Sequence, residues 1–167
     1  MKNFLIKRCL LTGVMALLSL MIMGCEKNEE NNDSNSHHFT AKVDGADWSS
    51  ASNQLIGSRT EDYLFISGAT SDENETISIN FFDFPGTAGT YTIGEGDYDF
   101  HCFYSIGETS YFVFDDVQAA TGKLVITDIT DNSVKGTFFF TGFSNDGDKS
   151  VTLTDGSFYL PVYSMSQ

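Results

Sequence analysis

The chain has 167 residues, enough for one ordinary domain, and its 9 basic and 23 acidic side chains give a formal net charge of −14. Because a charge of this sign repels phosphate backbones, the composition argues against a nucleic-acid partner. Aromatic residues make up 14% of the chain, with 15 glycines and 2 prolines. This excludes collagen-like and disordered chains and suits an aromatic-rich β domain.

Residues 1–24 have the layout of a secretory signal. Lys2, Lys7 and Arg8 precede an apolar run over residues 9–23. The run is shorter than the ~18–20 residues that a membrane-spanning helix needs, and acidic residues follow it. Since these three basic residues but no acidic ones lie in the signal, the rest of the chain is expected to carry a net charge of −17.

The signal ends in Ile22-Met23-Gly24-Cys25, which resembles a bacterial lipobox. The resemblance implies cleavage before Cys25, a diacylglycerol on its thiol, and a further acyl chain such as palmitate on its amine. Each buried CH₂ contributes about 0.8 kcal/mol, so three chains would hold the protein on a membrane. We therefore expect Cys25 to be the lipid anchor of a cell-envelope protein.

Residues 25–37 are the expected flexible tether, with no hydrophobic residue between Cys25 and His37. Its acidic start resembles the short export tag that follows the lipidated Cys in surface lipoproteins of Bacteroidota-type bacteria. That resemblance implies an outer-membrane protein exposed at the cell surface. A spacer on a protein that faces the periplasm is the alternative.

Residues 38–167 are expected to form a single all-β domain, because apolar residues recur with period two and no amphipathic helix of ten residues is found. About nine or ten short strands with turns every 8–12 residues are typical of an antiparallel β-sandwich or closed barrel. The last strands form a C-terminal meander. The candidate strand segments, some of which are short enough to merge or drop out, are residues 39–43, 55–60, 63–69, 76–83, 90–93, 97–106, 110–114, 123–130, 134–143, 151–154 and 157–163. Turns are expected at 44–45, 61–62, 85–86, 131–132, 145–148 and 155–156.

Several strands are apolar on both faces, which leaves two explanations open. Loops or barrel closure cover the second face, or one face presents an aromatic platform for a ligand. Trp48, the only Trp, either plugs one end of the fold or stacks on a ligand. The residues predicted for such a platform are Trp48, Phe82, Phe84, Phe139 and Phe143.

The domain opens with Phe39-Thr-Ala-Lys-Val-Asp-Gly45 and Trp48, continues through Ile77-Ser-Ile-Asn-Phe81, and later contains Gly122-Lys-Leu-Val-Ile-Thr127. This succession resembles small Bacteroidota lipoproteins whose single β domain has no known function. The shared motifs are turn glycines, hairpin Asp-Gly pairs and alternating Phe. They include no catalytic residue, so the resemblance implies an envelope lipoprotein without indicating an activity.

No motif for catalysis, a cofactor or a metal is found. His37 and His38 are adjacent in an extended segment and point opposite ways, so they do not easily share a metal. His101 and Cys102 fail as a catalytic pair for the same reason. Cys102 is in phase with apolar residues, which favours a small buried side chain over a reactive thiol.

Acidic clusters are the one abundant reactive feature. We interpret them as a solvated rim that keeps the domain soluble, while Ca²⁺ binding and a glycosidase-like carboxylate pair are the alternatives. The clusters are Glu95, Asp97 and Asp99; Asp115 and Asp116; and Asp146 and Asp148.

The sequence thus predicts a lipid-anchored envelope protein with a non-catalytic binding role, its partner a glycan, a small ligand or another envelope protein. The alternatives are a purely structural component docked on an envelope protein and a carboxylate-dependent enzyme. An aromatic pocket with polar rims would favour a ligand, a flat aromatic patch a protein partner, and two facing carboxylates an enzyme.

Overall fold

The computed structural model describes residues 36–94, 99–113 and 121–164. These ranges contain twelve β-strands and one 3₁₀ turn, η1 (Ser52–Gln54), so the all-β prediction is confirmed. The strands are β1 (His38–Val43), β2 (Ala46–Ser49), β3 (Leu55–Arg59), β4 (Tyr63–Ala69), β5 (Glu75–Phe82), β6 (Gly89–Thr92), β7 (Asp99–Ile106), β8 (Thr109–Val113), β9 (Thr121–Ile129), β10 (Ser133–Ser144), β11 (Ser150–Pro161) and β12 (Tyr163–Ser164).

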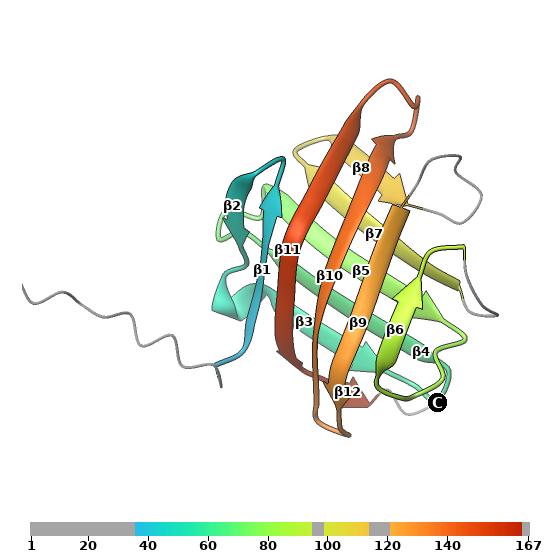
Figure 1. Ribbon diagram of the computed structural model, residues 1–167. Helices are drawn as coiled ribbons and strands as arrows, with labels where there is room; N and C mark the ends of the chain where they lie inside the picture. Colours follow the sequence, from blue (N-terminus) through green and yellow to red (C-terminus); the bar gives the residue numbers. More distant parts are fainter. Residues whose placement is uncertain (1–35, 95–98, 114–120, 165–167) are drawn as a thin grey trace, which may run out of the picture. The chain divides into compact units, whose positions relative to one another are not determined.

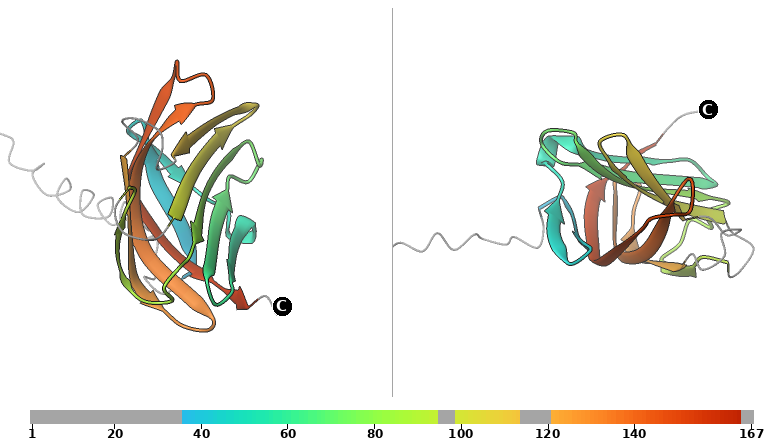
Figure 2. Two further views of the ribbon diagram at one scale, coloured as in Figure 1. Left: turned by 90° about the vertical axis from the view of Figure 1, so that its right-hand side faces the viewer. Right: turned by 90° about the horizontal axis from the view of Figure 1, so that it is seen from above.

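The strands form two layers of a β-sandwich (Figure 1). One layer has the order β12-β3-β4-β5-β7-β8, and the other has β2-β1-β11-β10-β9-β6. Figure 2 shows the two layers facing each other. The two layers belong to one continuous hydrogen-bonded sheet that is not closed into a barrel. Of the two predicted architectures, the fold is therefore the sandwich.

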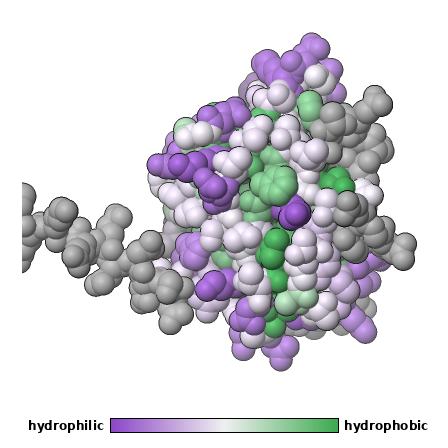
Figure 3. Space-filling model, in the orientation of Figure 1, coloured by the Kyte–Doolittle hydropathy of each residue, from purple (hydrophilic) through white to green (hydrophobic). Residues whose placement is uncertain are grey.

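The layers are joined where β10 changes partners. Most of β10 pairs antiparallel with β9 and β11, whereas only Phe143 and Ser144 at its end pair with Phe112 and Tyr111 of β8. After β11 the chain passes into the other layer, where β12 pairs in parallel with β3. Figure 3 views the outer face of the β9-β10-β11 layer, where a narrow apolar strip runs over β9 and β10 between more polar surroundings.

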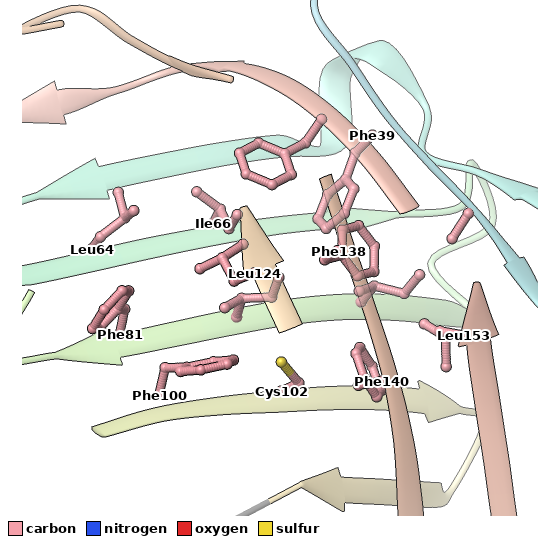
Figure 4. Close-up of a cluster of buried hydrophobic side chains, with 14 of the residues drawn as sticks. Phe39, Leu64, Ile66, Phe81, Phe100, Cys102, Leu124, Phe138, Phe140 and Leu153 are labelled. Carbon is pink, nitrogen blue, oxygen red and sulfur yellow. The ribbon is translucent and has the colours of Figure 1, made fainter. Parts of the chain in front are cut away.

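The core lies between the layers and follows from the period of two. Alternate residues of each strand point inward, and the rings of Phe39, Phe81, Phe100 and Phe140 are at most 1% exposed. Figure 4 shows such rings and aliphatic side chains from both layers filling the same space. Large rings pack there edge-to-face, as Phe39 does against Phe138 with centroids 5.2 Å apart.

Asp155-Gly156 is not the predicted turn. β11 runs through it without interruption, and its register with β10 shifts between Phe138 and Phe140. The extra residue forms a β-bulge, in which Asp155 has a φ of 52°. The predicted meander is therefore made of three long strands, β9, β10 and β11.

Two short strands were not predicted. β2 has four residues, of which only Trp48 is buried, and β12 has two residues. Neither is long enough for an alternation of apolar and polar residues to be recognised.

Candidate functional site

The five residues predicted for an aromatic platform do not lie together. Trp48 and Phe84 belong to the core, 5% and 2% exposed, so neither lies on an exposed face. Phe82 and Phe139 are exposed by 42% and 43%, but β5 and β10 belong to opposite layers. Phe143 is partly buried near the end of β10, where the layers join.

Phe84 is buried because the strand alternation stops before it. β5 ends at Phe82, and Asp83 adopts a φ of 51°. The chain turns back, the backbone N–H of Phe84 donates to the carbonyl of Asp62 at 2.9 Å, and the ring packs on Phe81 with centroids 4.9 Å apart. From the sequence, the strand was expected to end at residue 83, but Phe84 was placed on the same face as Phe82 by extending the alternation beyond that end.

A different aromatic surface lies on the outer side of β4, β5, β7 and β8. Because Leu64 and Ile66 point into the core, the alternation turns Tyr63 and Phe65 outward. The antiparallel registers then set the outward residues in rows across the strands. The rows are Tyr63, Phe82 and Asp99; Phe65, Asn80 and His101; and Ser67, Ser78, Phe103 and Phe112, of which Ser67 is buried. We call this surface the aromatic face.

The rings of the aromatic face form a chain across four strands. Ring centroids are 5.2 Å apart for Tyr63 and Phe82, 5.6 Å for Phe82 and His101, and 6.4 Å for His101 and Phe103. Phe103 and Phe112 follow at 5.5 Å. The chain spans three inter-strand spacings, or about 14 Å.

Polar side chains occupy the centre of the aromatic face. Asn80 lies between Phe65 and His101 in the middle row, and Ser78 is the next outward residue of β5. The Tyr63 hydroxyl donates to Oδ1 of Asn80 at 2.7 Å, which orients the amide and leaves its nitrogen as a donor. Burial raises the pKa of Tyr63, so the hydroxyl keeps its proton.

His101 stands at the rim of this centre. Its Nε2 lies 2.8 Å from Oδ1 of Asp99, and the His101 side chain is 24% exposed. From the sequence, His101 was considered only as a partner of Cys102, and Tyr63, Phe65, Phe103 and Phe112 were not predicted to form a surface. The alternation of each strand already indicated these residues, because the outward-facing residues are those that lie between the predicted core positions.

The remaining reactive side chains have separate surroundings in the part of the chain described. Cys102 is 1% exposed on the inner side of β7, opposite to His101 in direction, and burial raises the pKa of its thiol. His38 contacts Ser157, with Nε2 3.1 Å from Oγ, whereas the His37 ring contacts Tyr159 at 4.9 Å. No group of three His, Cys, Asp or Glu placed to hold a metal occurs among the described residues.

The acidic cluster at the β10–β11 turn is held by local hydrogen bonds. Ser144 donates its hydroxyl and Asp148 its backbone N–H to Oδ1 of Asp146, and these bonds lower the pKa of Asp146. Asp99 belongs to the aromatic face. The other predicted cluster residues, Glu95, Asp97, Asp115 and Asp116, lie outside the described residues, as do the signal, Cys25 and most of the tether.

Within the described ranges, no helix has the length and hydrophobicity needed to cross a membrane. The fold is that of an acidic β-sandwich with an aromatic outer face. Residues 35–160 match the domain of unknown function DUF6252, and the chain belongs to this family. Comparison with curated proteins and with solved structures gave no significant match to either.

Proposed function

We propose that the protein is a lipoprotein of the bacterial cell envelope that binds a neutral glycan, without catalysis, on its aromatic face. Cys25 carries the lipid, residues 1–24 are the cleaved signal, and residues 25–37 connect the anchor to the domain. The Ile-Met-Gly-Cys junction supports the anchor, and the acidic residues after Cys25 support exposure on the outer membrane, as in Bacteroidota-type lipoproteins.

The observation that carries the proposal is the polar centre of the aromatic face. A pyranose ring has apolar C–H faces, which stack on aromatic rings, and an edge of hydroxyl groups. Phe82 and Phe103 offer rings on either side of the Asn80 amide and the Ser78 hydroxyl, so stacking and hydrogen bonding can act on one sugar chain. Because the aromatic face is the outer side of a sheet, it is closer to the flat patch expected for a protein partner than to a pocket. The Asn80 amide and the Ser78 hydroxyl at its centre favour the glycan nevertheless, since the cores of protein interfaces are depleted of polar groups.

The charge of the chain agrees with a neutral ligand. With 23 acidic and 9 basic side chains, the protein as a whole repels polyanions. A neutral glycan is not subject to this repulsion, whereas nucleic acids and highly anionic polysaccharides are.

Affinity electrophoresis in gels that contain xyloglucan, galactomannan, mixed-linkage β-glucan or starch tests the proposal. We expect at least one polysaccharide to retard the wild-type protein, and Phe82→Ala to weaken the binding about tenfold or more, a loss of about 1.4 kcal/mol. Phe139→Ala is the matched control, because Phe139 is exposed as much as Phe82 but lies on the other layer.

Equal retardation of both variants would contradict the assignment of the aromatic face. If no polysaccharide retards the protein, a photo-crosslinking amino acid at position 82 in intact cells gives the second answer. A crosslink there to an envelope protein would replace the glycan by a protein partner.

A further inference from the structure

The outer surface of the β4–β8 layer continues beyond β4, where the aromatic face ends. β3 and β12 extend the same layer, and Ser58 of β3 pairs with Phe65 on one side and with Tyr163 of β12 on the other. Paired residues of neighbouring strands point to the same side of a sheet, so Ser58 and Tyr163 lie on the outer side together with Phe65. Tyr163 is 67% exposed, more than any other large hydrophobic side chain in the described ranges. The layer therefore ends at β12 in an open aromatic ring.

The middle row of this surface alternates rings with polar side chains. Beyond Ser58 and Phe65 the row runs to Asn80 of β5 and His101 of β7. Rings thus stand on β12, β4 and β7, and a hydroxyl and an amide stand between them on β3 and β5. Successive rings are two inter-strand spacings apart, about 10 Å, and the whole row covers four spacings, about 19 Å. The row is therefore much longer than a single sugar unit.

The side chains of the row are accessible from solvent. Ser58, Phe65, Asn80 and His101 are each partly exposed. The Tyr63 hydroxyl holds Oδ1 of Asn80 at 2.7 Å, so the amide nitrogen is oriented and remains a donor for a ligand. The row can thus offer ring faces and hydrogen-bonding groups to one molecule along its length.

An extended β-1,4-linked glycan has a repeat that fits this alternation. Neighbouring pyranose units of such a chain face opposite ways, and a disaccharide is about as long as two inter-strand spacings. The rings of the row can then stack on alternate units, while Ser58 and Asn80 meet hydroxyl groups of the units between them. An α-1,4-linked chain coils instead, so it would leave a flat row after a short contact.

We propose that the aromatic face binds an internal stretch of a neutral β-1,4-linked glycan, which lies across the strands from β12 to β7 along the middle row. This inference rests on the proposed glycan binding and adds to it the linkage, the length and the direction of the ligand. Phe82 and Phe103, which belong to the rows on either side, flank the chain. Tyr163 is the outermost ring of the site.

Isothermal titration calorimetry of the full-length protein tests the length of the site. The probes are cellohexaose and mannohexaose, the corresponding disaccharides cellobiose and mannobiose, and maltohexaose as the coiled α-linked control. We expect at least one β-linked hexasaccharide to bind about tenfold or more tightly than its disaccharide, because the disaccharide reaches only part of the row. Maltohexaose should bind no better than a disaccharide.

Tyr163 tests the direction of the chain. Tyr163→Ala should weaken binding of the hexasaccharide about fivefold, because one stacking ring is lost. Tyr163→Phe keeps the ring and should bind like wild type, as should Phe139→Ala on the other layer. Since the Tyr163 side chain is largely exposed, we expect all these variants to keep the thermal midpoint of the wild-type protein.

The outcomes separate this inference from the proposed function. Retardation by starch alone, or equal affinities for a hexasaccharide and its disaccharide, would leave glycan binding standing and overturn the extended β-linked site. A Tyr163→Ala variant that binds the hexasaccharide like wild type would overturn it as well. If none of the polysaccharides and none of the oligosaccharides bind, both proposals fail.

Discussion

Cys102 and His101 are neighbours in sequence that meet entirely different surroundings. The thiol of Cys102 is packed in the core, where the lack of solvent disfavours the thiolate and raises the pKa. His101 points to the aromatic face and contacts Asp99. Their divergence follows from the alternation of a strand and was predictable from the sequence.

The burial of Cys102 gives a test of the core at residue scale. Because only the thiolate reacts, we expect iodoacetamide at mildly alkaline pH to alkylate Cys102 at least about a thousandfold more slowly in the folded protein than in denaturant. Peptide mapping by mass spectrometry measures both rates. Rapid alkylation under native conditions would contradict the packing of β7.

The surroundings of Trp48 could not be predicted from the sequence. The sequence left open whether Trp48 plugs the fold or meets a ligand, because β2 is too short to show a period. The structure buries the ring among core residues, but its unpaired N–H could be found only once the neighbours of the ring were known.

At the scale of strands, two Asp-Gly pairs with one sequence adopt different structures. Asp44 and Gly45 both have positive φ, 49° and 85°, as a tight hairpin turn requires. Asp155 also has a positive φ, but Gly156 does not, and β11 continues through the pair. A Cβ at position 156 would lie 2.5 Å from the carbonyl oxygen of Phe138. Gly156 is thus needed because β10 passes close to it, and this could not be predicted without knowing which strand pairs with β11.

Two glycines of β10 test this element. A Cβ at Gly136 would lie 2.1 Å from the carbonyl oxygen of Val125 and 2.6 Å from the ring of Phe158, whereas at Gly142 its nearest neighbour is 3.3 Å away. Both glycines are buried, and neither has a positive φ. We expect Gly136→Ala to lower the free energy of unfolding by about 3 kcal/mol or more and Gly142→Ala by about 1 kcal/mol or less, as urea denaturation would measure. Equal losses would contradict the β9–β10 register.

At the scale of the molecule, the period of two was sufficient to predict an all-β domain, most strand positions and the meander. The choice between sandwich and barrel was not predictable, because it depends on β10 pairing with β8 by only two residues and on the crossing of β11 into β12. The aromatic face was missed for a related reason. Its members come from four strands, and only the registers place Phe82, Asn80 and Phe103 on one surface.

The central claim is that Cys25 anchors the domain by its lipid at the cell surface, where the aromatic face binds a glycan. Its most direct test is flow cytometry of intact cells that express the full-length chain, stained with the fluorescent form of whichever polysaccharide retards the protein. We predict staining with wild type and with Phe139→Ala, loss with Phe82→Ala because the ring is missing, and loss with Cys25→Ala because the domain is no longer held on the membrane. Staining of Phe82→Ala cells equal to wild type, at equal protein levels, would contradict the account.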